Sequence, residues 1–278
     1  MKKYIVLQTD FGTEWPFVST MKGVIKQVDP QLEVFDSCHQ ITPYSILEAS
    51  QQLNYISPFW AADIVFVSVV DPGVGTDRRA SCFLLGNGQY VISPDNGSLT
   101  HLYHNVGIRE VREIRKNLRW PGSEDISVFH GRDIFAYAAA LLASGQLSFE
   151  EIGEKYEDIV LLDQRYLKAQ IEEEQCAGIV TNVSDHFGSV VLSIGVAPFL
   201  KAGYQYGNLL EVTLENENGV YYHDTVPYVH TFAEVEPGKC LLFNSSSGCL
   251  SLGINQGSFR DSYGVTAGLN QKVTLKRK

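Results

Sequence analysis

The first half of the sequence alternates short apolar runs with segments of helical spacing. The runs at 4–7 and 65–70 are short and rich in β-branched residues, which is typical of strands buried on both faces. The run at 32–35 reads as a further strand. Residues 17–28 place apolar side chains at positions 17, 18, 21, 24, 25 and 28, the spacing of one helix face; residues 46–55 also read as a helix. Strands that alternate with helices indicate βαβ units, so we predict an α/β fold with a mainly parallel sheet and flanking helices.

The composition changes after Gly153. A charge-rich segment at 154–174 is followed by short alternating runs with turn residues between them, at 177–183, 189–194, 209–214, 226–228, 239–243, 249–254 and 273–275. Short strands at this spacing indicate a small antiparallel β-barrel. We therefore predict two domains: an N-terminal α/β domain at 1–165 and a C-terminal β-barrel domain at 166–278.

The overall charge and the cysteines limit the partners and the compartment. A net charge of -10 over 278 residues argues against binding to nucleic acid, whose phosphates need clustered Lys and Arg. No apolar run approaches the length of a membrane span, and the four-residue run near the N-terminus is too short for a signal peptide. Five scattered cysteines without a CxxC pair favour reduced thiols, so we expect a cytoplasmic protein.

Acidic residues follow the predicted strands. Asp71 comes at the end of the run at 65–70, Pro72 and Gly73 then stop the strand, and Arg78 closes the loop. Asp10 follows the first run in the same way. Ligands of open α/β sheets bind outside the carboxyl ends of the strands, where a carboxylate and a guanidinium can polarise a water or hold an anion. The alternative is a turn with a surface ion pair.

A histidine stands at the start of a predicted helix. His130 and Gly131 precede an apolar segment at 134–142 that ends at Gly145. Unpaired N–H groups at a helix start attract negative charge, so His130 is a candidate site residue. The alternative is a histidine that packs in a loop. The segment at 109–124 is charged and is expected to be irregular.

Several kinds of site can be compared on residue types alone. A metal site is a candidate because hard or borderline ligands are present, namely Asp10, Asp36, His39, Asp71 and His130. Against it, no HxH, HxxxH or ExxH pair supplies local ligand geometry. The sequence contains no GxGxxG or Walker A motif, and no serine lies in a GxSxG elbow.

Five ordered motifs together carry a family resemblance. They are Asp10-Phe11-Gly12, Met21-Lys22-Gly23-Val24-Ile25, Val70-Asp71-Pro72-Gly73-Val74-Gly75-Thr76, Pro94-Asp95-Asn96-Gly97 and Phe129-His130-Gly131-Arg132-Asp133. The chain resembles the S-adenosyl-L-methionine (SAM) hydroxide adenosyltransferases, SAM-hydrolysing relatives of fluorinase and chlorinase. The resemblance implies a homotrimer with SAM bound between neighbouring subunits. It also assigns the family's catalytic Asp, Arg and His to Asp71, Arg78 and His130.

The resemblance implies hydrolysis of SAM to adenosine and L-methionine by attack of an activated water on the ribose C5′. It implies no metal and no other cofactor. The halogenase members carry Tyr where Asp71 stands and a halide-contacting Ser where Gly131 stands, so this sequence favours water as the nucleophile.

The resemblance also implies a set of substrate-binding residues. Asp10 is expected to hold the ribose hydroxyls, Asp185 the methionine ammonium, and the segment at 244–250 the adenine. Ser189 replaces a usual Asn and Trp15 replaces a usual acid, whereas Asn96 is expected to stabilise its own turn. The expected substrate contacts are Asp10, Phe11, Tyr44, Asp185, Phe187, Ser189, Ser246, Ser251 and Ile254.

Two other functions stay open from the sequence. One is a module that binds SAM or adenosine without turnover, which would be favoured if Asp71, Arg78 and His130 failed to converge. The other is a metal-dependent nucleosidase or phosphatase.

Overall fold

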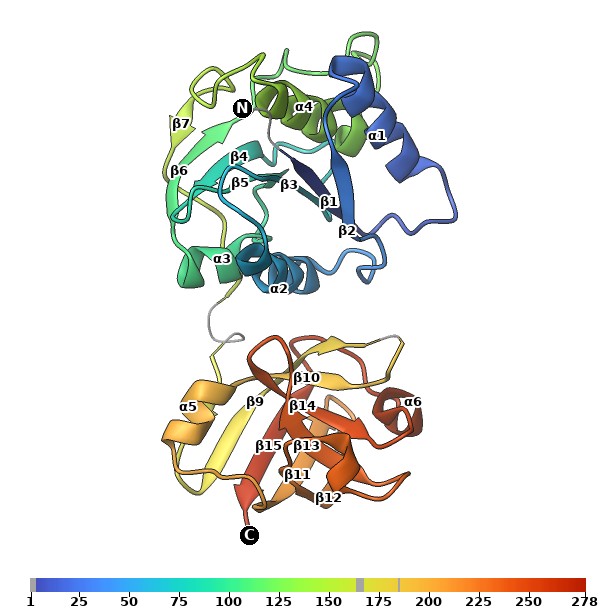
Figure 1. Ribbon diagram of the computed structural model, residues 1–278, viewed down its shortest axis with the longest axis vertical. Coiled ribbons are helices and arrows are strands. Elements are labelled where there is room, and N and C mark those ends of the chain that lie inside the picture. The colour runs from blue at the N-terminus through green and yellow to red at the C-terminus, as the bar shows by residue number, and fades with distance from the viewer. Residues whose placement is uncertain (1–3, 164–167, 185) are drawn as a thin grey trace. The chain divides into compact units, whose positions relative to one another are not determined.

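The computed structural model describes residues 4–163, 168–184 and 186–278 (Figure 1). It divides into two compact units, one up to Leu162 and one from Asp163 onward, and each is described by itself. The predicted domain boundary between residues 165 and 166 lies outside the described residues.

The first unit is built on a seven-stranded sheet in the order β2-β1-β3-β5-β4-β6-β7. β2, β1, β3 and β5 pair in parallel, and every strand except β4 and β7 runs in the same direction. The strands are β1 (Ile5–Thr9), β2 (Val34–Cys38), β3 (Val65–Val69), β4 (Ala80–Leu85), β5 (Tyr90–Pro94), β6 (Ile108–Glu113) and β7 (Lys155–Tyr156).

Helices cover both faces of this sheet (Figure 1). On one face, α1 (Phe17–Val28) and α4 (Tyr137–Ser144) pack on Leu7 and Val67 of the central strands. On the other face, α2 (Ile46–Ile56) and α3 (Thr100–Asn105) pack on Val6 and Phe66. Because successive strand residues point to opposite faces, burial on both sides explains the apolar runs that form β1 and β3, whereas β2 at the edge of the sheet is mostly exposed.

The sequence-based description of this unit needs three corrections. The charged segment at 109–124 is not wholly irregular, because it contains most of β6, in which Val111 is buried between charged neighbours. The short α3 was not predicted. The helix expected at 134–142 begins earlier, as a π-helix, η2 (Gly131–Ala136), that continues into α4.

The second unit is an antiparallel sheet in the order β12-β11-β15-β9-β10-β14-β13, with β8 (Gln170–Ile171) paired to β9. A bridge between Tyr228 and Leu242 joins the two ends of that order, so the sheet forms a nearly closed barrel around an apolar core. The other strands are β9 (Gln175–Val183), β10 (Val190–Gly195), β11 (Leu209–Asn216), β12 (Gly219–Pro227), β13 (Cys240–Asn244), β14 (Cys249–Ile254) and β15 (Lys272–Arg277). The predicted fold class is confirmed.

Short helices complete the two units. They are η1 (Ser57–Phe59) in the first unit, and α5 (Val196–Lys201), η4 (Phe232–Glu234) and α6 (Phe259–Tyr263) in the second. Within the described ranges, no helix is long and apolar enough to cross a membrane.

The strand register brings two predicted site residues to one edge of the first sheet. β1 and β3 pair in parallel with Thr9 opposite Val69. Asp10 and Asp71 therefore both follow the carboxyl ends of neighbouring strands, the place where α/β sheets build their sites.

Candidate active site

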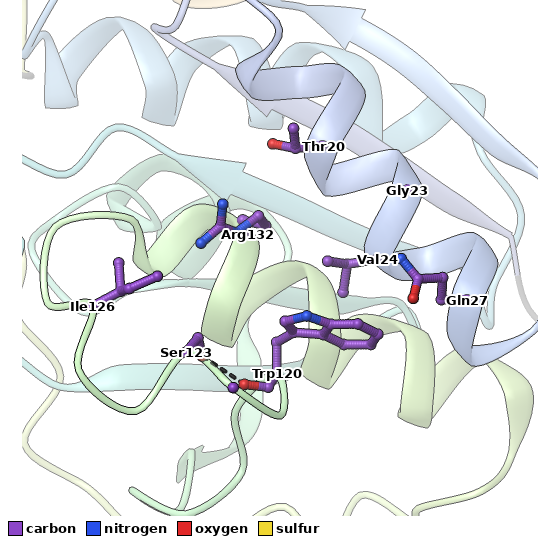
Figure 2. Close-up of a pocket in the computed structure, with 9 residues that line it drawn as sticks. Thr20, Gly23, Val24, Gln27, Trp120, Ser123, Ile126 and Arg132 are labelled. Atoms are coloured by element: carbon purple, nitrogen blue, oxygen red, sulfur yellow. Dashed lines mark hydrogen bonds between the residues drawn. The ribbon is translucent and has the colours of Figure 1, made fainter.

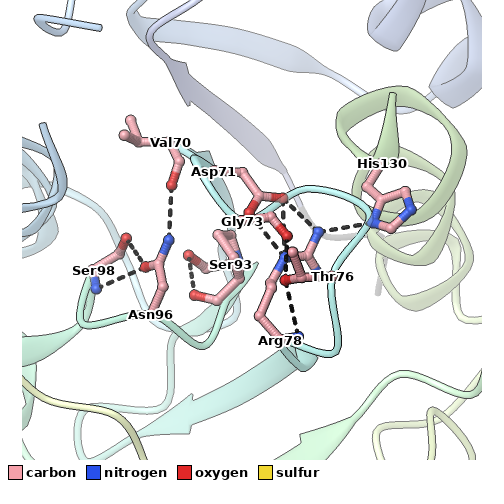
Figure 3. A network of polar contacts seen from close by, with 10 residues as sticks. Val70, Asp71, Gly73, Thr76, Arg78, Ser93, Asn96, Ser98 and His130 are labelled. Carbon is pink, nitrogen blue, oxygen red and sulfur yellow. Dashed lines mark hydrogen bonds and ion pairs between the residues drawn. The ribbon is translucent and has the colours of Figure 1, made fainter. Parts of the chain in front are cut away.

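The three predicted catalytic side chains meet in one hydrogen-bonded cluster (Figure 3). Arg78 donates from Nε to both carboxylate oxygens of Asp71, at 2.9 and 3.1 Å, and its Nη2 also contacts Oδ2 of the same carboxylate. That Nη2 lies 2.8 Å from Nδ1 of His130. The three predicted catalytic side chains therefore converge, and all of them belong to the first unit.

The loop between β3 and β4 folds back on itself to bring Arg78 to Asp71. Two consecutive turns, from Val74 N–H to the Asp71 carbonyl and from Thr76 N–H to the Gly73 carbonyl, reverse the chain. A Cβ at Gly73 would lie 3.3 Å from Cγ of Arg78, so the missing side chain leaves room for the arginine stem. The guanidinium also lies over the ring of Phe135 in η2, 5.2 Å from its centroid.

The ion pair is largely removed from water. The side chains of Asp71 and Arg78 are 5% and 10% exposed. Burial lowers the pKa of His130, and the nearby positive charge of Arg78 lowers it further, against a smaller opposing effect of Asp71. His130 is therefore neutral around neutral pH.

The hydrogen bonds also define which nitrogen of His130 carries the proton. A guanidinium can only donate, so Nδ1 of His130 must accept the hydrogen from Arg78. The proton of the neutral imidazole then lies on Nε2. His130 consequently offers an N–H donor to a ligand, and Asp71 supplies the only acceptor-only group of the three.

Asp10 lies beside this cluster. Its Oδ2 accepts a hydrogen bond of 2.9 Å from the backbone N–H of Tyr44, whose positive φ of 68° turns the chain toward it. Burial raises the pKa of Asp10, the Tyr44 N–H opposes that shift, and the charge of Asp71 adds to it. The Tyr44 ring is exposed. Two predicted substrate contacts thus share one corner of the candidate site.

Phe11 packs at the start of η2. A Cβ built on the buried Gly131 would lie 3.1 Å from two atoms of the Phe11 ring and 3.3 Å from the Phe129 ring. Phe11 contacts Phe129 edge to face, with ring centroids 5.8 Å apart. The backbone next to His130 therefore lies directly against two aromatic rings, and only glycine leaves them undisturbed.

The predicted contacts of the second unit lie on its strands and loops. Phe187 and Ser246 are exposed, Ser189 directly precedes β10, and Ile254 ends β14. Ser251 is buried, and its hydroxyl donates to the Val190 carbonyl at 2.8 Å, so this hydroxyl already has a partner in the barrel. Asp185 lies outside the described residues. The roles of this group stay predictions.

Asn96 supports the site from the neighbouring strand. Its Oδ1 accepts from both the backbone N–H and the hydroxyl of Ser98, as expected for a residue that stabilises its own turn. Its Nδ2 also donates to the Val70 carbonyl at 2.9 Å, which holds the residue before Asp71 (Figure 3). The sequence motif indicated the turn, but the bond to Val70 depends on strand order and could not be read from it.

A separate cavity of about 400 Å³ lies between α1 and the loop that precedes η2 (Figure 2). Arg132 reaches its wall while paired to Asp133. The remaining wall consists of Thr20, Gly23, Val24, Gln27, Trp120, Gly122, Ser123 and Ile126. Asp10, Asp71, Arg78 and His130 are not part of this wall, so the cavity is distinct from the hydrogen-bonded cluster.

The metal candidates are arranged differently from a metal site. Nε2 of His39 lies 3.0 Å from Asp36, and Nδ1 lies 2.9 Å from the Thr9 hydroxyl. Across the part of the chain that the structure describes, no three His, Cys, Asp or Glu side chains are grouped as metal ligands.

Comparison with known proteins matches both units. The SAM hydroxide adenosyltransferase N-terminal domain matches residues 5–153, and the corresponding C-terminal domain matches residues 180–271. The (R)-S-adenosyl-L-methionine hydrolase of Salinispora tropica is 34% identical over 98% of this chain and 97% of its own. A fluorinase of Actinopolyspora mzabensis is 26% identical over 97% of this chain and 96% of its own.

A solved structure supports the same relationship. The crystal structure of an uncharacterized conserved protein from Thermotoga maritima superposes with a TM-score of 0.87 and 32% identity. The match covers 98% of this chain and 100% of that one.

Proposed function

The chain belongs to the SAM hydroxide adenosyltransferase family, and on that premise we propose that it hydrolyses SAM to adenosine and L-methionine. The observation that carries the proposal is the cluster of Asp71, Arg78 and His130 at the carboxyl edge of the sheet. The similar hydrolases are named for (R)-S-adenosyl-L-methionine, and we propose this form as the substrate.

The proposed reaction is a single displacement at the ribose C5′. The oxygen of water forms a bond to C5′ while the bond from C5′ to sulfur breaks. The electron pair of that bond neutralises the sulfonium, which leaves as the thioether of methionine. One proton of the water stays on the 5′ oxygen and the other is released. SAM and water therefore give adenosine, methionine and one proton.

The limiting problem is the nucleophile, because bulk water has a pKa of about 15.7. The sulfonium needs no acid, since it leaves without taking up a proton. The protein therefore has to orient water and accept the proton that water loses. No metal or other cofactor is needed for such a step.

The geometry supports distinct roles for the three side chains. Asp71 is the acceptor for a proton of the water. His130, with its proton on Nε2, donates to the water oxygen and so fixes the direction of its lone pair. Arg78 holds both groups, because one guanidinium contacts the carboxylate and the imidazole together. Positioning of this kind supplies a large share of catalysis in enzymes.

Water as the nucleophile is supported by the environment of Gly131. In the halogenase members the resemblance implies a Ser at this position, and here the Phe11 and Phe129 rings lie within 3.1–3.3 Å of where its Cβ would be. A halide-contacting side chain has no space there without movement of these rings.

We propose that SAM contacts residues of both units. In the first, Asp10 binds the ribose hydroxyls beside Phe11 and Tyr44. In the second, Asp185 binds the methionine ammonium and residues around Ser246 bind the adenine. The family resemblance implies a homotrimer in which neighbouring chains supply the two parts. Closed rings of this kind give one composite site at each interface.

Mixed trimers test the shared site. His130→Ala chains and Asp185→Ala chains should each be nearly inactive alone. Co-expression should restore part of the activity, since some interfaces would combine two intact parts. If each chain forms its own site, every site contains one of the two substitutions and no activity returns. Sedimentation as a 30.9 kDa monomer would also contradict the trimer.

Product analysis tests the function itself. Purified protein is incubated with SAM in chloride buffer, with and without a chelator, and the products are separated by chromatography. We expect adenosine and methionine in both samples. Predominant 5′-chloroadenosine would contradict water as the nucleophile, and activity that is lost in chelator and restored by a divalent ion would contradict the metal-free mechanism.

A further inference from the structure

A hydrogen-bonded chain outside the catalytic cluster ends on the turn that carries Asp10. Lys22 on α1 contacts Asp36 on β2 at 2.5 Å, and the other carboxylate oxygen of Asp36 lies 3.0 Å from Nε2 of His39. Nδ1 of His39 lies 2.9 Å from the hydroxyl of Thr9, the last residue of β1. The Thr9 hydroxyl in turn accepts from the backbone N–H of Phe11 at 3.2 Å.

When His39 is neutral, the direction of each hydrogen bond in this series follows from the Asp36 carboxylate. A carboxylate can only accept, so Nε2 of His39 carries the hydrogen that Asp36 receives. Nδ1 then has only a lone pair and accepts the hydrogen of the Thr9 hydroxyl. The Thr9 oxygen is thereby left with lone pairs toward the Phe11 N–H. His39 thus determines the orientation of a hydroxyl that holds the next turn.

His39 holds the same turn a second time. Its backbone carbonyl accepts from the N–H of Gly12 at 2.7 Å, and Gly12 has a positive φ of 67°. Phe11 and Gly12, the two residues after Asp10, are therefore both tied to His39, one through Thr9 and one directly. The His39 side chain is only 5% exposed and Thr9 is fully buried, so water does not substitute for these contacts.

The turn serves both parts of the proposed site. Asp10 accepts the Tyr44 N–H and is the proposed ribose ligand. Phe11 lies against Gly131, next to His130. We propose that Thr9 and His39, oriented by Asp36, are positioning residues that set the Asp10-Phe11 turn for substrate binding. This inference rests on the proposed function, although neither residue needs to contact the substrate.

Asp36 can fix the orientation of the His39 ring because its carboxyl group is charged. Burial alone would raise the pKa of this carboxyl, but hydrogen bonds from Lys22 and His39 outweigh it and the pKa is lowered. Asp36 is therefore ionised at neutral pH. Because the carboxylate is itself exposed, we expect its replacement to have a smaller effect than loss of the buried Thr9 hydroxyl.

Thr9→Val is the main test, since it removes the hydroxyl and keeps the branched shape. We expect the KM for SAM to rise about tenfold with kcat within about twofold, the scale of one ordinary hydrogen bond. Thr9→Ser keeps the hydroxyl and should restore KM. His39→Asn can still accept from Thr9 through its side-chain oxygen, whereas His39→Leu cannot, so the Leu variant should be the weaker binder.

Ser68→Ala is the matched control. Ser68 is fully buried on the neighbouring strand β3, where its hydroxyl accepts from Nε2 of Gln8 at 3.0 Å. Its loss should lower the melting temperature as Thr9→Val does and leave KM unchanged. If both variants raise KM equally, or if Thr9→Ser is no better than Thr9→Val, the positioning role is wrong and the hydroxyl serves only stability.

Amide hydrogen exchange gives a readout that does not depend on turnover. Exchange in a peptide that spans residues 10–12 should accelerate in Thr9→Val and stay at the wild-type rate in Ser68→Ala. Unchanged exchange would overturn the inference even if KM changes. If wild-type protein releases no adenosine while Thr9→Val still shows faster exchange, the proposed function is wrong. The claim that the Thr9 hydroxyl stabilises the turn at residues 10–12 would then still be supported.

Discussion

Removal of the Arg78 guanidinium should destabilise the first unit far more than loss of a surface charge. In Arg78→Met the carboxylate of Asp71, 5% exposed, would lose its ion-pair partner in the interior. Breaking a buried pair by removing one partner costs about 3–5 kcal/mol. In a unit of this size each kcal/mol corresponds to about 2–4 °C in melting temperature, so we expect a decrease of about 6–20 °C by calorimetry.

A second substitution separates charge from packing. Asp71→Asn in the Arg78→Met background removes the uncompensated charge, so the double variant should be clearly more stable than Arg78→Met alone. It should stay inactive, because two of the three proposed catalytic groups have changed. Lys155→Met is the control, since Lys155 is half-exposed and 4.0 Å from its partner Glu110, and such surface pairs contribute about 0–1 kcal/mol. A decrease for Arg78→Met no larger than that of Lys155→Met would refute the buried-pair account, as would a double variant less stable than the single one.

Three further predictions concern the histidine that orients the water, the ribose ligand and a partly buried histidine. His130→Ala should lower kcat by about a hundredfold or more, the scale of a positioned acid–base group, with SAM binding retained in calorimetric titration. Asp10→Ala should mainly raise KM, and a fall in kcat alone would contradict its assignment to binding. Burial lowers the pKa of His101 from 6.5 to about 4, so the folded protein binds fewer protons than the unfolded chain between these values. Stability should therefore fall as pH drops from 6.5 toward 4, by about 3 kcal/mol in total. His101→Gln should flatten this part of the curve measured by denaturant unfolding at several pH values.

The sequence predicted the regular elements of the first unit well where the periodicity was strong. The helix at 17–28 was expected with the bounds that α1 has, because its apolar face is continuous. β6 was missed because its apolar residues, Ile108 and Val111, are three positions apart with charged residues between them, so the sequence lacks the period of two that is typical of a strand. The π-helical start at Gly131 has no signal in the local sequence, and the close approach of the Phe11 ring to that backbone depends on tertiary packing.

Asp71, Arg78 and His130 were predicted as three site residues but not as one hydrogen-bonded unit. That Arg78 holds Asp71 and His130 with the same guanidinium requires the fold of the loop, which local sequence does not specify. His39 was considered only as a metal ligand. Its contact with Thr9 arises because β1 and β2 pair with Gln8 opposite Cys38, and this register cannot be read from residue types.

Hydrolysis of SAM in oxygen-18 water tests the central claim most directly. Attack of water on C5′ predicts adenosine with one oxygen-18 at its 5′ position and methionine without label, as measured by mass spectrometry of both products. The Asp71→Ala protein should give neither product above background. Label in the amino-acid product, a 5′-halogenated nucleoside, or no cleavage of SAM would contradict the account.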